Sequence, residues 1–135
     1  MPSFGKTSQA RLNTCDPKLQ DLFLEVVKYY DCIVLCGTRG EAEQNEAYRT
    51  GTSKLRYPES KHNSLPSKAI DVAPYFPTAP HIRWNDKDSF YHFAGFVRGI
   101  AALKGIKIRW GGDWDNDYEL KDQTFFDLPH FELVD

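Results

Sequence analysis

The sequence predicts one domain that combines α-helices with β-strands, with three helices and four or five short strands. Two long segments repeat apolar residues at helical spacing, and a third shorter segment ends at a glycine. Several apolar runs of four to six residues, bounded by turn-forming residues, have the length of strands. The chain has 135 residues, 41% of them hydrophobic. We therefore expect residues 1–135 to fold as a single domain with its own core.

The helices are predicted from their first residues and their apolar stripes. Asp16 and Pro17 are typical of a helix start, because aspartate accepts from free backbone N–H groups and proline fits the first turn. Apolar residues then follow at helical spacing. Two further helices are expected over Glu41–Thr50 and Lys87–Lys104, each followed by a glycine. Residues 1–15 are expected to form a leader strand or an arm.

The strands are predicted from short apolar or alternating runs. Ile33–Cys36 is an apolar run, and Lys68–Ala73 and Ile106–Trp110 alternate. Pro129 argues against a helix near the C-terminus, so His130–Leu133 is expected to be an edge or terminal strand. These runs account for the short strands of the predicted fold.

The charge of the chain is unevenly distributed. The net charge is −2, but Asp113–Asp135 holds eight acids and one base, whereas the preceding residues hold sixteen bases and eleven acids. The basic residues of this part either attract an anionic polymer or are an ordinary distribution of surface charges. The bases are not clustered, so no nucleic-acid partner is expected. No apolar run approaches the ~20 residues that cross a bilayer, and the N-terminus lacks the apolar stretch of a signal peptide. We expect no membrane insertion, and a monomer.

The three cysteines, Cys15, Cys32 and Cys36, do not predict a disulfide framework, because their number is odd and no secretion signal is present. Cys32 and Cys36 flank an apolar run and are expected to be reduced core residues. A closed zinc site at Cys-x3-Cys would need a second pair of ligands nearby, which the sequence lacks.

Two histidines and one aspartate are candidate metal ligands. His62 lies in a long loop, Asp71 follows nine positions later inside an apolar strand, and His130 lies near the C-terminus. Ala69 and Ala73 share the face of Asp71, which leaves room for an ion beside its carboxylate. Three protein ligands with an open fourth position are typical of catalytic zinc sites. We therefore expect a Zn²⁺ site, formed by distant segments.

Three further charged residues are candidates for chemistry at this site. Asp127, three residues before His130, is the best-placed general base for hydrolysis. Arg39 follows a strand and precedes a helix, where it could bind a substrate carboxylate, polarise a carbonyl or form a solvated ion pair. Glu132 shares a face with His130 and either orients that ligand or is exposed. No nucleophile elbow, phosphate loop or His-Glu-x-x-His motif is present.

An acidic loop is a second candidate for metal binding. Asp113, Asp115 and Asp117 alternate as calcium ligands do, but the glycine and the glutamate of an EF-hand are missing at the required positions. The loop is therefore either a looser Ca²⁺ site or a solvated acidic segment.

Several short motifs resemble those of the M15 family of zinc peptidases. They run from about residue 16 to the end of the chain. This family includes phage L-alanyl-D-glutamate endopeptidases and bacterial D-alanyl-D-alanine peptidases, and a wider group includes lysostaphin and the Hedgehog signalling domain. The motifs are Ser60-Lys61-His62, Ala69-Ile70-Asp71, Gly111-Gly112-Asp113-Trp114, Asp127-Leu128-Pro129-His130-Phe131-Glu132, and Gly37-Thr38-Arg39 with Glu43-Gln44.

The resemblance implies an α+β fold, with a small, mainly antiparallel sheet, helices packed on it and a metal on its open face. It implies that His62, Asp71 and His130 ligate zinc, that Asp127 is the catalytic base, and that Arg39 is the motif arginine. One departure is the interval between the first two ligands, where this chain carries extra residues around Leu65-Pro66-Ser67.

The function implied by the resemblance is hydrolysis of the L-Ala–D-Glu bond in peptidoglycan stem peptides by a phage endolysin without a separate wall-binding domain. Such an enzyme waits in the host cytoplasm and reaches the periplasm and cell wall after a holin opens the membrane. Two alternatives stay open: a D-Ala-D-Ala carboxypeptidase, and a Hedgehog-like zinc module that binds a partner without hydrolysis.

Overall fold

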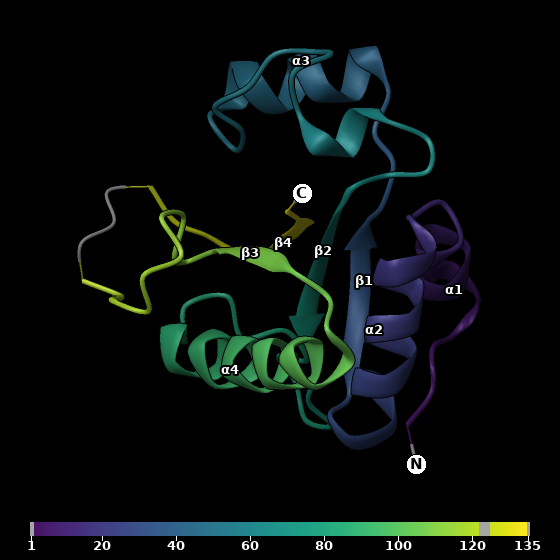
Figure 1. Cartoon of the computed structure of the whole chain (residues 1–135), viewed down its shortest axis with the longest axis vertical. Coiled ribbons are helices and arrows are strands. Elements are labelled where there is room, and N and C mark those ends of the chain that lie inside the picture. The colour runs from purple at the N-terminus through teal and green to yellow at the C-terminus, as the bar shows by residue number, and fades with distance from the viewer. Residues whose placement is uncertain (1, 122–124, 135) are drawn as a thin grey trace.

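Four antiparallel strands form one sheet at the centre of the protein (Figure 1). The computed structural model describes residues 2–121 and 125–134. The sheet confirms the predicted α+β class. Its strands, in order across the sheet, are β1 (Cys32–Cys36), β2 (Ala69–Pro74), β4 (Asp127–Leu133) and β3 (Ile108–Gly111).

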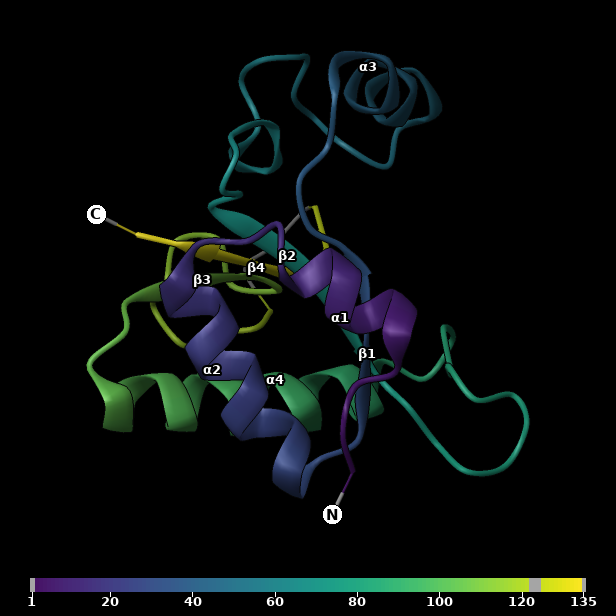
Figure 2. The same cartoon turned by 90° about the vertical axis from the view of Figure 1, so that its right-hand side faces the viewer.

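Helices lie on both sides of this sheet. The long helices α2 and α4 cover one face, whereas α3 lies on the opposite side (Figure 2). The helices are α1 (Lys6–Leu12), α2 (Pro17–Tyr29), α3 (Glu41–Thr50) and α4 (Lys87–Lys104), and a short 3₁₀ turn, η1, spans Lys61–Asn63. The starts of α2 and α4 are as predicted, because the side chains of Asp16 and Asp86 accept from backbone N–H groups of the first turn.

The core lies between the sheet and helices α2 and α4. The ring of Phe131 on β4 packs edge-on against Phe23 of α2 and Phe93 of α4, with centroid distances of 5.5 and 6.2 Å. All three side chains are buried. Since successive residues of a strand point to opposite faces, His130 and Glu132 point away from this core. The packing of Phe131 therefore presents both polar residues to the side of the sheet that α3 faces.

The N-terminal residues differ from the prediction, because they include a fourth helix, α1, instead of a leader strand or arm. The backbone N–H of Val34 on β1 donates to the Ser8 hydroxyl, and the Arg11 guanidinium donates to the Val34 carbonyl. Both side chains belong to α1. The helix thus satisfies the outer edge of β1 through side chains, which protects an edge strand as a further strand would.

The C-terminal strand also differs from the prediction in one respect. β4 is the last strand of the chain, but it begins at Asp127 and lies between β2 and β3 instead of at an edge. Its pairing with β3 shifts between Trp110, opposite Phe131, and Gly111, opposite Asp127. Pro129 falls within this irregularity, where its missing N–H costs no ladder hydrogen bond.

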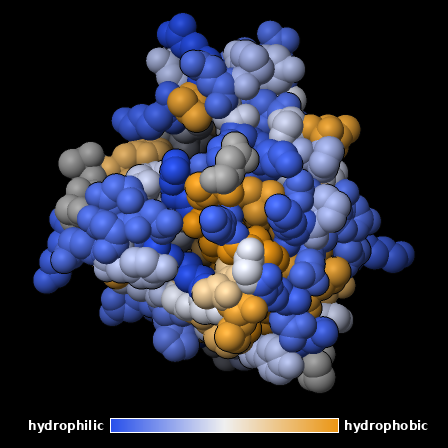
Figure 3. All heavy atoms as spheres, in the orientation of Figure 1, coloured by the Kyte–Doolittle hydropathy of each residue, from blue (hydrophilic) through white to orange (hydrophobic). Residues whose placement is uncertain are grey.

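Hydrophilic residues cover most of the face shown in Figure 3, and hydrophobic residues gather mainly around its centre. Among the described residues, no helix combines the length and the hydropathy that a bilayer-spanning helix needs. The large apolar side chains are mostly in the core between the sheet and α2 and α4.

Candidate active site

The structure brings the three predicted metal ligands together. Asp71 on β2 and His130 on β4 are direct cross-strand partners, and His62 reaches them from η1. Nε2 of His62 lies 3.2 Å from Oδ1 of Asp71 and 3.3 Å from Nδ1 of His130. Nδ1 of His130 lies 3.3 Å from the same aspartate oxygen. Three atoms that can bind a metal thus meet on the side of the sheet opposite the core.

The other nitrogen of each histidine has its own hydrogen-bond acceptor. Nδ1 of His62 donates to the Gly37 carbonyl oxygen at 2.7 Å, and Nε2 of His130 donates to Oε1 of Glu132 at 2.7 Å. Because the outer nitrogens donate these hydrogen bonds, the nitrogens that face Asp71 are the ones that can act as ligands once they have lost their protons. Glu132 is buried and orients His130, so of the two predicted roles the structure supports the orienting one.

The charges of the cluster favour a cation at its centre. Burial alone would lower the pKa of His62, but the Asp71 carboxylate outweighs it and raises the pKa to about 10. Burial also opposes protonation of His130, and Asp71 and Glu132 raise its pKa to about 9. In turn, the two histidines outweigh the burial of Asp71 and hold the pKa of its carboxyl well below the usual range. Protons or a metal cation can supply the positive charge.

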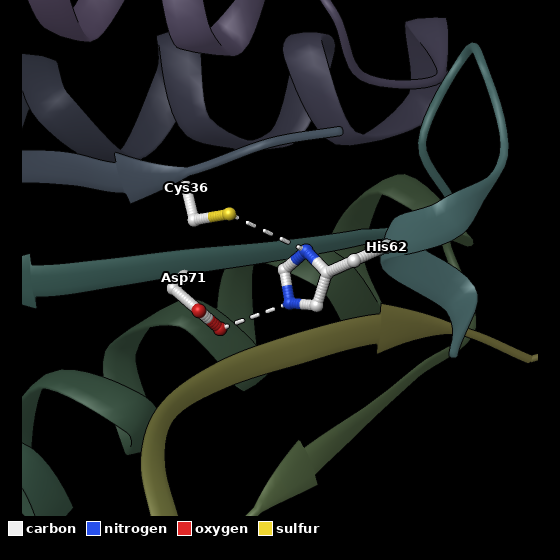
Figure 4. A group of neighbouring side chains, drawn as sticks. All are labelled: Cys36, His62 and Asp71. Carbon is white, nitrogen blue, oxygen red and sulfur yellow. Dashed lines mark hydrogen bonds and ion pairs between the residues drawn. The ribbon is translucent and has the colours of Figure 1, made fainter. Parts of the chain in front are cut away.

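Cys36 lies closer to this cluster than predicted. All three cysteines have free thiols, and Cys15 and Cys32 are buried, but Cys36 is only half-buried. Its sulfur lies 3.9 Å from Nδ1 of His62, on the side of the ring away from Asp71 (Figure 4). Cys36, His62, Asp71 and His130 together form a possible metal site. The prediction that Cys36 is a plain core residue is wrong, because the bulge at the end of β1 turns it toward the site.

Asp127 lies beside the cluster at the start of β4. Its Oδ2 is 3.7 Å from Nδ1 of His130. Burial and the charge of Asp71 raise the pKa of Asp127 to about 6. The backbone of Asp127 approaches Gly111 so closely that a Cβ at that glycine would lie 2.0 Å from the Asp127 carbonyl oxygen. Glycine at position 111 therefore permits the irregular pairing that places Asp127 here.

Arg39 is held in a hydrogen-bond network and is not a solvated ion pair. Its guanidinium lies 3.3 Å from Oδ2 of Asp71 and donates to Oε1 of Gln44 at 3.0 Å, with 16% of its side chain exposed. This pair places a fixed positive charge beside the predicted metal ligand Asp71.

Gln44 on α3 is a residue whose role the sequence did not reveal. It is fully buried, and both ends of its amide are used. The amide oxygen accepts from Arg39 and Asn63, and the amide nitrogen donates to Ser53 and to the Leu55 carbonyl. Gln44 thereby connects the arginine beside Asp71 with the loop that follows α3. In the sequence, only its place in the motif Gly37-Thr38-Arg39 with Glu43-Gln44 indicated a role for it.

A cavity of about 320 Å³ opens over the cluster. This volume is at the lower end of the range of about 300–1,000 Å³ for small-molecule sites. Trp114 and Phe125 stack at the cavity, with ring centroids 6.1 Å apart, and Trp114 also contacts the His130 ring. Trp114 belongs to one of the motifs that resemble the family, Gly111-Gly112-Asp113-Trp114. The polar and charged lining comes from Arg39, Thr52, Ser53, Lys54, Glu59, Ser60, Lys61, His62, Asp127, His130 and Glu132.

The acidic loop has its three aspartates close together, as the calcium hypothesis requires. Asp113 is buried and pairs with the Arg98 guanidinium at 2.8 Å, and its Oδ2 also accepts from the Tyr118 backbone at 2.8 Å. Both interactions hold the pKa of Asp113 below its usual value despite burial. Asp113 is therefore not solvated, whereas Asp115 and Asp117 are exposed.

Comparisons with known proteins agree with this geometry. The family described as phage L-alanyl-D-glutamate peptidase matches residues 2–134. The L-alanyl-D-glutamate peptidase of Escherichia phage T5 is 36% identical over 137 residues, covering 97% of each chain. The crystal structure of the Serratia marcescens L-Ala D-Glu endopeptidase ChiX superposes with a TM-score of 0.72 at 27% identity, covering 98% of this chain and 91% of that one.

These matches confirm the predicted resemblance and the α+β fold. They extend over nearly the whole sequence, including every segment that contributes to the cluster of His62, Asp71 and His130. The chain belongs to the phage L-alanyl-D-glutamate peptidase family, and it is an endopeptidase of that phage type.

Proposed function

We propose that this endopeptidase depends on zinc and that its substrate is the L-Ala–D-Glu bond of peptidoglycan stem peptides. The observation that carries the proposal is the convergence of His62, Asp71 and His130, with a fourth side open toward the cavity that Asp127 lines. Three protein ligands and one open position are typical of catalytic zinc sites.

The spacing of the three ligand atoms supports zinc. Ligands at about 2.0–2.1 Å from a tetrahedral centre lie about 3.3–3.4 Å from one another. The two imidazole nitrogens and the Asp71 oxygen are 3.2–3.3 Å apart. Cys36 fits less well as a ligand of the same ion, because the histidine nitrogen nearest its sulfur already donates to a carbonyl oxygen.

Zinc at such a site acts as a Lewis acid and makes water acidic enough to serve as a nucleophile near neutral pH. The proposed base is Asp127, which in its ionised form takes a proton from the attacking water and then gives it to the departing amine. Its raised pKa of about 6 suits both steps, because the carboxyl can gain and lose a proton near neutrality. Arg39 holds Asp71 and adds positive charge near the developing oxyanion.

Two alternative functions are less well supported. A D-Ala-D-Ala carboxypeptidase could use the same metal and base, but the matched family and the phage T5 relative are described as L-alanyl-D-glutamate peptidases, and ChiX as an L-Ala D-Glu endopeptidase. A zinc module that only binds a partner has no need of a carboxylate with a raised pKa beside the metal ligands, and Asp127 is such a carboxylate.

The lysis role follows from the family as a further part of the proposal. Peptidoglycan is the proposed partner, reached from the host cytoplasm after a holin opens the membrane. A monomeric single domain spanning residues 1–135 stays a prediction. Calcium binding by Asp113, Asp115 and Asp117 also stays a prediction, and EGTA at levels that spare zinc should change activity or melting temperature if it is correct.

The proposal is tested by digesting peptidoglycan with the wild type and with Asp127→Ala, each with and without added zinc after chelation. Mass spectrometry should detect fragments that begin with D-Glu, only for the wild type and only with metal. Release of terminal D-alanine alone would identify the carboxypeptidase. Zinc binding without any cleavage would identify the binding module.

A further inference from the structure

We propose that Lys54 is a specificity-determining residue that binds the free carboxylate of the D-glutamate residue at the scissile bond. This inference rests on the proposed function. D-glutamate has two carboxyl groups, and the peptide continues through only one of them. The other is an anion next to the reacting bond unless it is amidated. A cation at the cavity would bind this anion and thereby distinguish the acid from its neutral amide.

Among the described residues, the lysines and arginines that line the cavity are Arg39, Lys54 and Lys61, and Arg39 and Lys61 already have anionic partners. Arg39 pairs with Asp71 and donates to Gln44. Lys61 lies 3.6 Å from Oε2 of Glu132 and donates to the Leu133 carbonyl. Recruiting either one for substrate would break an ion pair that already supports the cluster, Arg39 with Asp71 or Lys61 with Glu132.

Lys54 is different, because it has no ion pair among the residues that the structure describes. Its ammonium group lies over the ring of Phe125, 5.1 Å from the centroid. A contact of this kind at an exposed site is weak compared with a charge-assisted hydrogen bond to a carboxylate. A substrate anion can therefore draw the lysine from the ring without breaking another salt bridge.

The backbone on both sides of Lys54 is anchored near the metal cluster. Gln44 donates to the Ser53 hydroxyl at 3.0 Å and to the Leu55 carbonyl at 2.6 Å. The same amide accepts from Arg39, which contacts Asp71. The position of Lys54 in the chain is thus held relative to the reacting centre, while its side chain is exposed at the rim of the cavity.

The test compares two synthetic stem peptides that differ only in this group, one with the free D-glutamate carboxylate and one with its carboxamide. The wild type should cleave the acid with a kcat/KM about tenfold higher than the amide, mainly through KM, because the ion pair forms when substrate binds. Lys54→Met should lose this preference and leave the amide rate within about twofold of wild type. Lys54→Arg should retain most of it.

Lys87→Met is the matched control, because Lys87 lies 5.0 Å over the neighbouring Phe126 ring but does not line the cavity. It should keep the wild-type preference. The inference is overturned if the wild type cleaves both peptides equally, if Lys54→Met keeps the preference, or if Lys54→Met slows both peptides alike. A wild type that cleaves neither peptide overturns the proposed function itself, so the two failures are distinguishable.

Discussion

The imidazole of His130 and the carboxylate of Glu132, two residues apart on β4, form a hydrogen bond of 2.7 Å directed away from His62 and Asp71. Glu132 is itself held by Lys61 and Arg109, whose nitrogens lie 3.6 and 3.7 Å from its other oxygen. The hydrogen bond selects the neutral tautomer of His130 that carries its hydrogen on Nε2. In this tautomer Nδ1, the nitrogen that faces Asp71, has its lone pair available for a metal. Burial alone would raise the pKa of Glu132, but the hydrogen bond and charge of His130, followed by the charges of Lys61 and Arg109, lower it.

Glu132→Ala should therefore weaken zinc binding by about 10- to 100-fold, because His130 loses the acceptor that orients its ring. Glu132→Gln retains an acceptor oxygen and should show a smaller loss. Affinity is measured by competition with a chromogenic chelator, and activity at saturating zinc separates binding from chemistry. Glu25→Ala, which removes a surface carboxylate paired with Lys28, is the control. Unchanged affinity in Glu132→Ala would contradict the orienting role.

Asp127→Asn should lower the rate of hydrolysis by at least about 100-fold, because the amide cannot take the proton of water. It should also stabilise the metal-free protein. The pKa of Asp127 is raised to about 6, so above that pH the ionised carboxyl is less favourable in the folded protein than in the unfolded chain. Removing this charge should stabilise the fold by about 3 kcal/mol at pH 7.5, because a shift from 3.8 to about 6 corresponds to about 1.4 kcal/mol per pKa unit.

Both effects are measurable on the same preparations, by muropeptide release and by thermal unfolding with chelator present. Asp21→Asn is a suitable control, because Asp21 is a largely exposed carboxylate that pairs with Lys104 far from the cavity. An Asp127→Asn variant with normal activity would exclude the proposed base. A variant that is less stable than wild type would contradict the electrostatic explanation of its pKa.

Zinc binding near pH 7.5 should release close to two protons. The pKa values of His62 and His130 are raised to about 10 and 9, so both rings are protonated at that pH before metal binds, and a ligating imidazole must be neutral. The apparent affinity should rise with pH up to about 10, where the second of the two rings has lost its proton. Titration calorimetry in buffers of different ionisation enthalpy counts the protons, and His62→Asn should release no more than one. Enthalpies that do not depend on the buffer would refute the prediction.

The sequence alone predicted the elements of the site that local chemistry determines. Asp71 stands in an apolar strand between two alanines, and a carboxylate there is costly unless a cation is nearby. Alternation along the last strand placed His130 and Glu132 on one face and Phe131 on the other, as the structure has them. The helix starts at Asp16 and Asp86 were likewise local features.

The features of the fold and the site that the sequence did not predict depend on contacts between distant segments. Nothing near α1 in the sequence indicates that Ser8 and Arg11 complete the edge of β1, and the half-buried position of Cys36 depends on a bulge against β2. In the sequence, Gln44 looks like an ordinary polar residue of an amphipathic helix. Its importance comes from four side-chain hydrogen bonds, which go to residues up to nineteen positions away. Periodicity and propensity do not contain such information.

Gln44→Leu tests how far the site depends on this network. Leucine has a similar size but removes one hydrogen-bond partner each from Arg39, Asn63 and the Leu55 carbonyl, and a buried polar group left unsatisfied costs about 1–3 kcal/mol. We expect the free energy of unfolding to fall by about 2–4 kcal/mol, allowing for partial compensation by water. Denaturant unfolding measures this loss. Gln9→Ala, which removes a half-buried glutamine paired with Asn13, should change the free energy of unfolding by less than about 0.5 kcal/mol.

The same variant should also lose activity while it is still folded. Arg39 would keep its pair with Asp71, but the loop that carries Ser53 and Leu55 would lose its anchor, so KM should rise more than kcat falls. Gln44→Glu distinguishes the contribution of the amide oxygen from that of the amide nitrogen. The glutamate oxygens can still accept from Arg39, but no nitrogen remains to donate to Ser53 and Leu55 of the loop. If Gln44→Glu binds substrate as well as the wild type does, the loop anchor is not needed, and the arginine contact alone explains why this residue is buried.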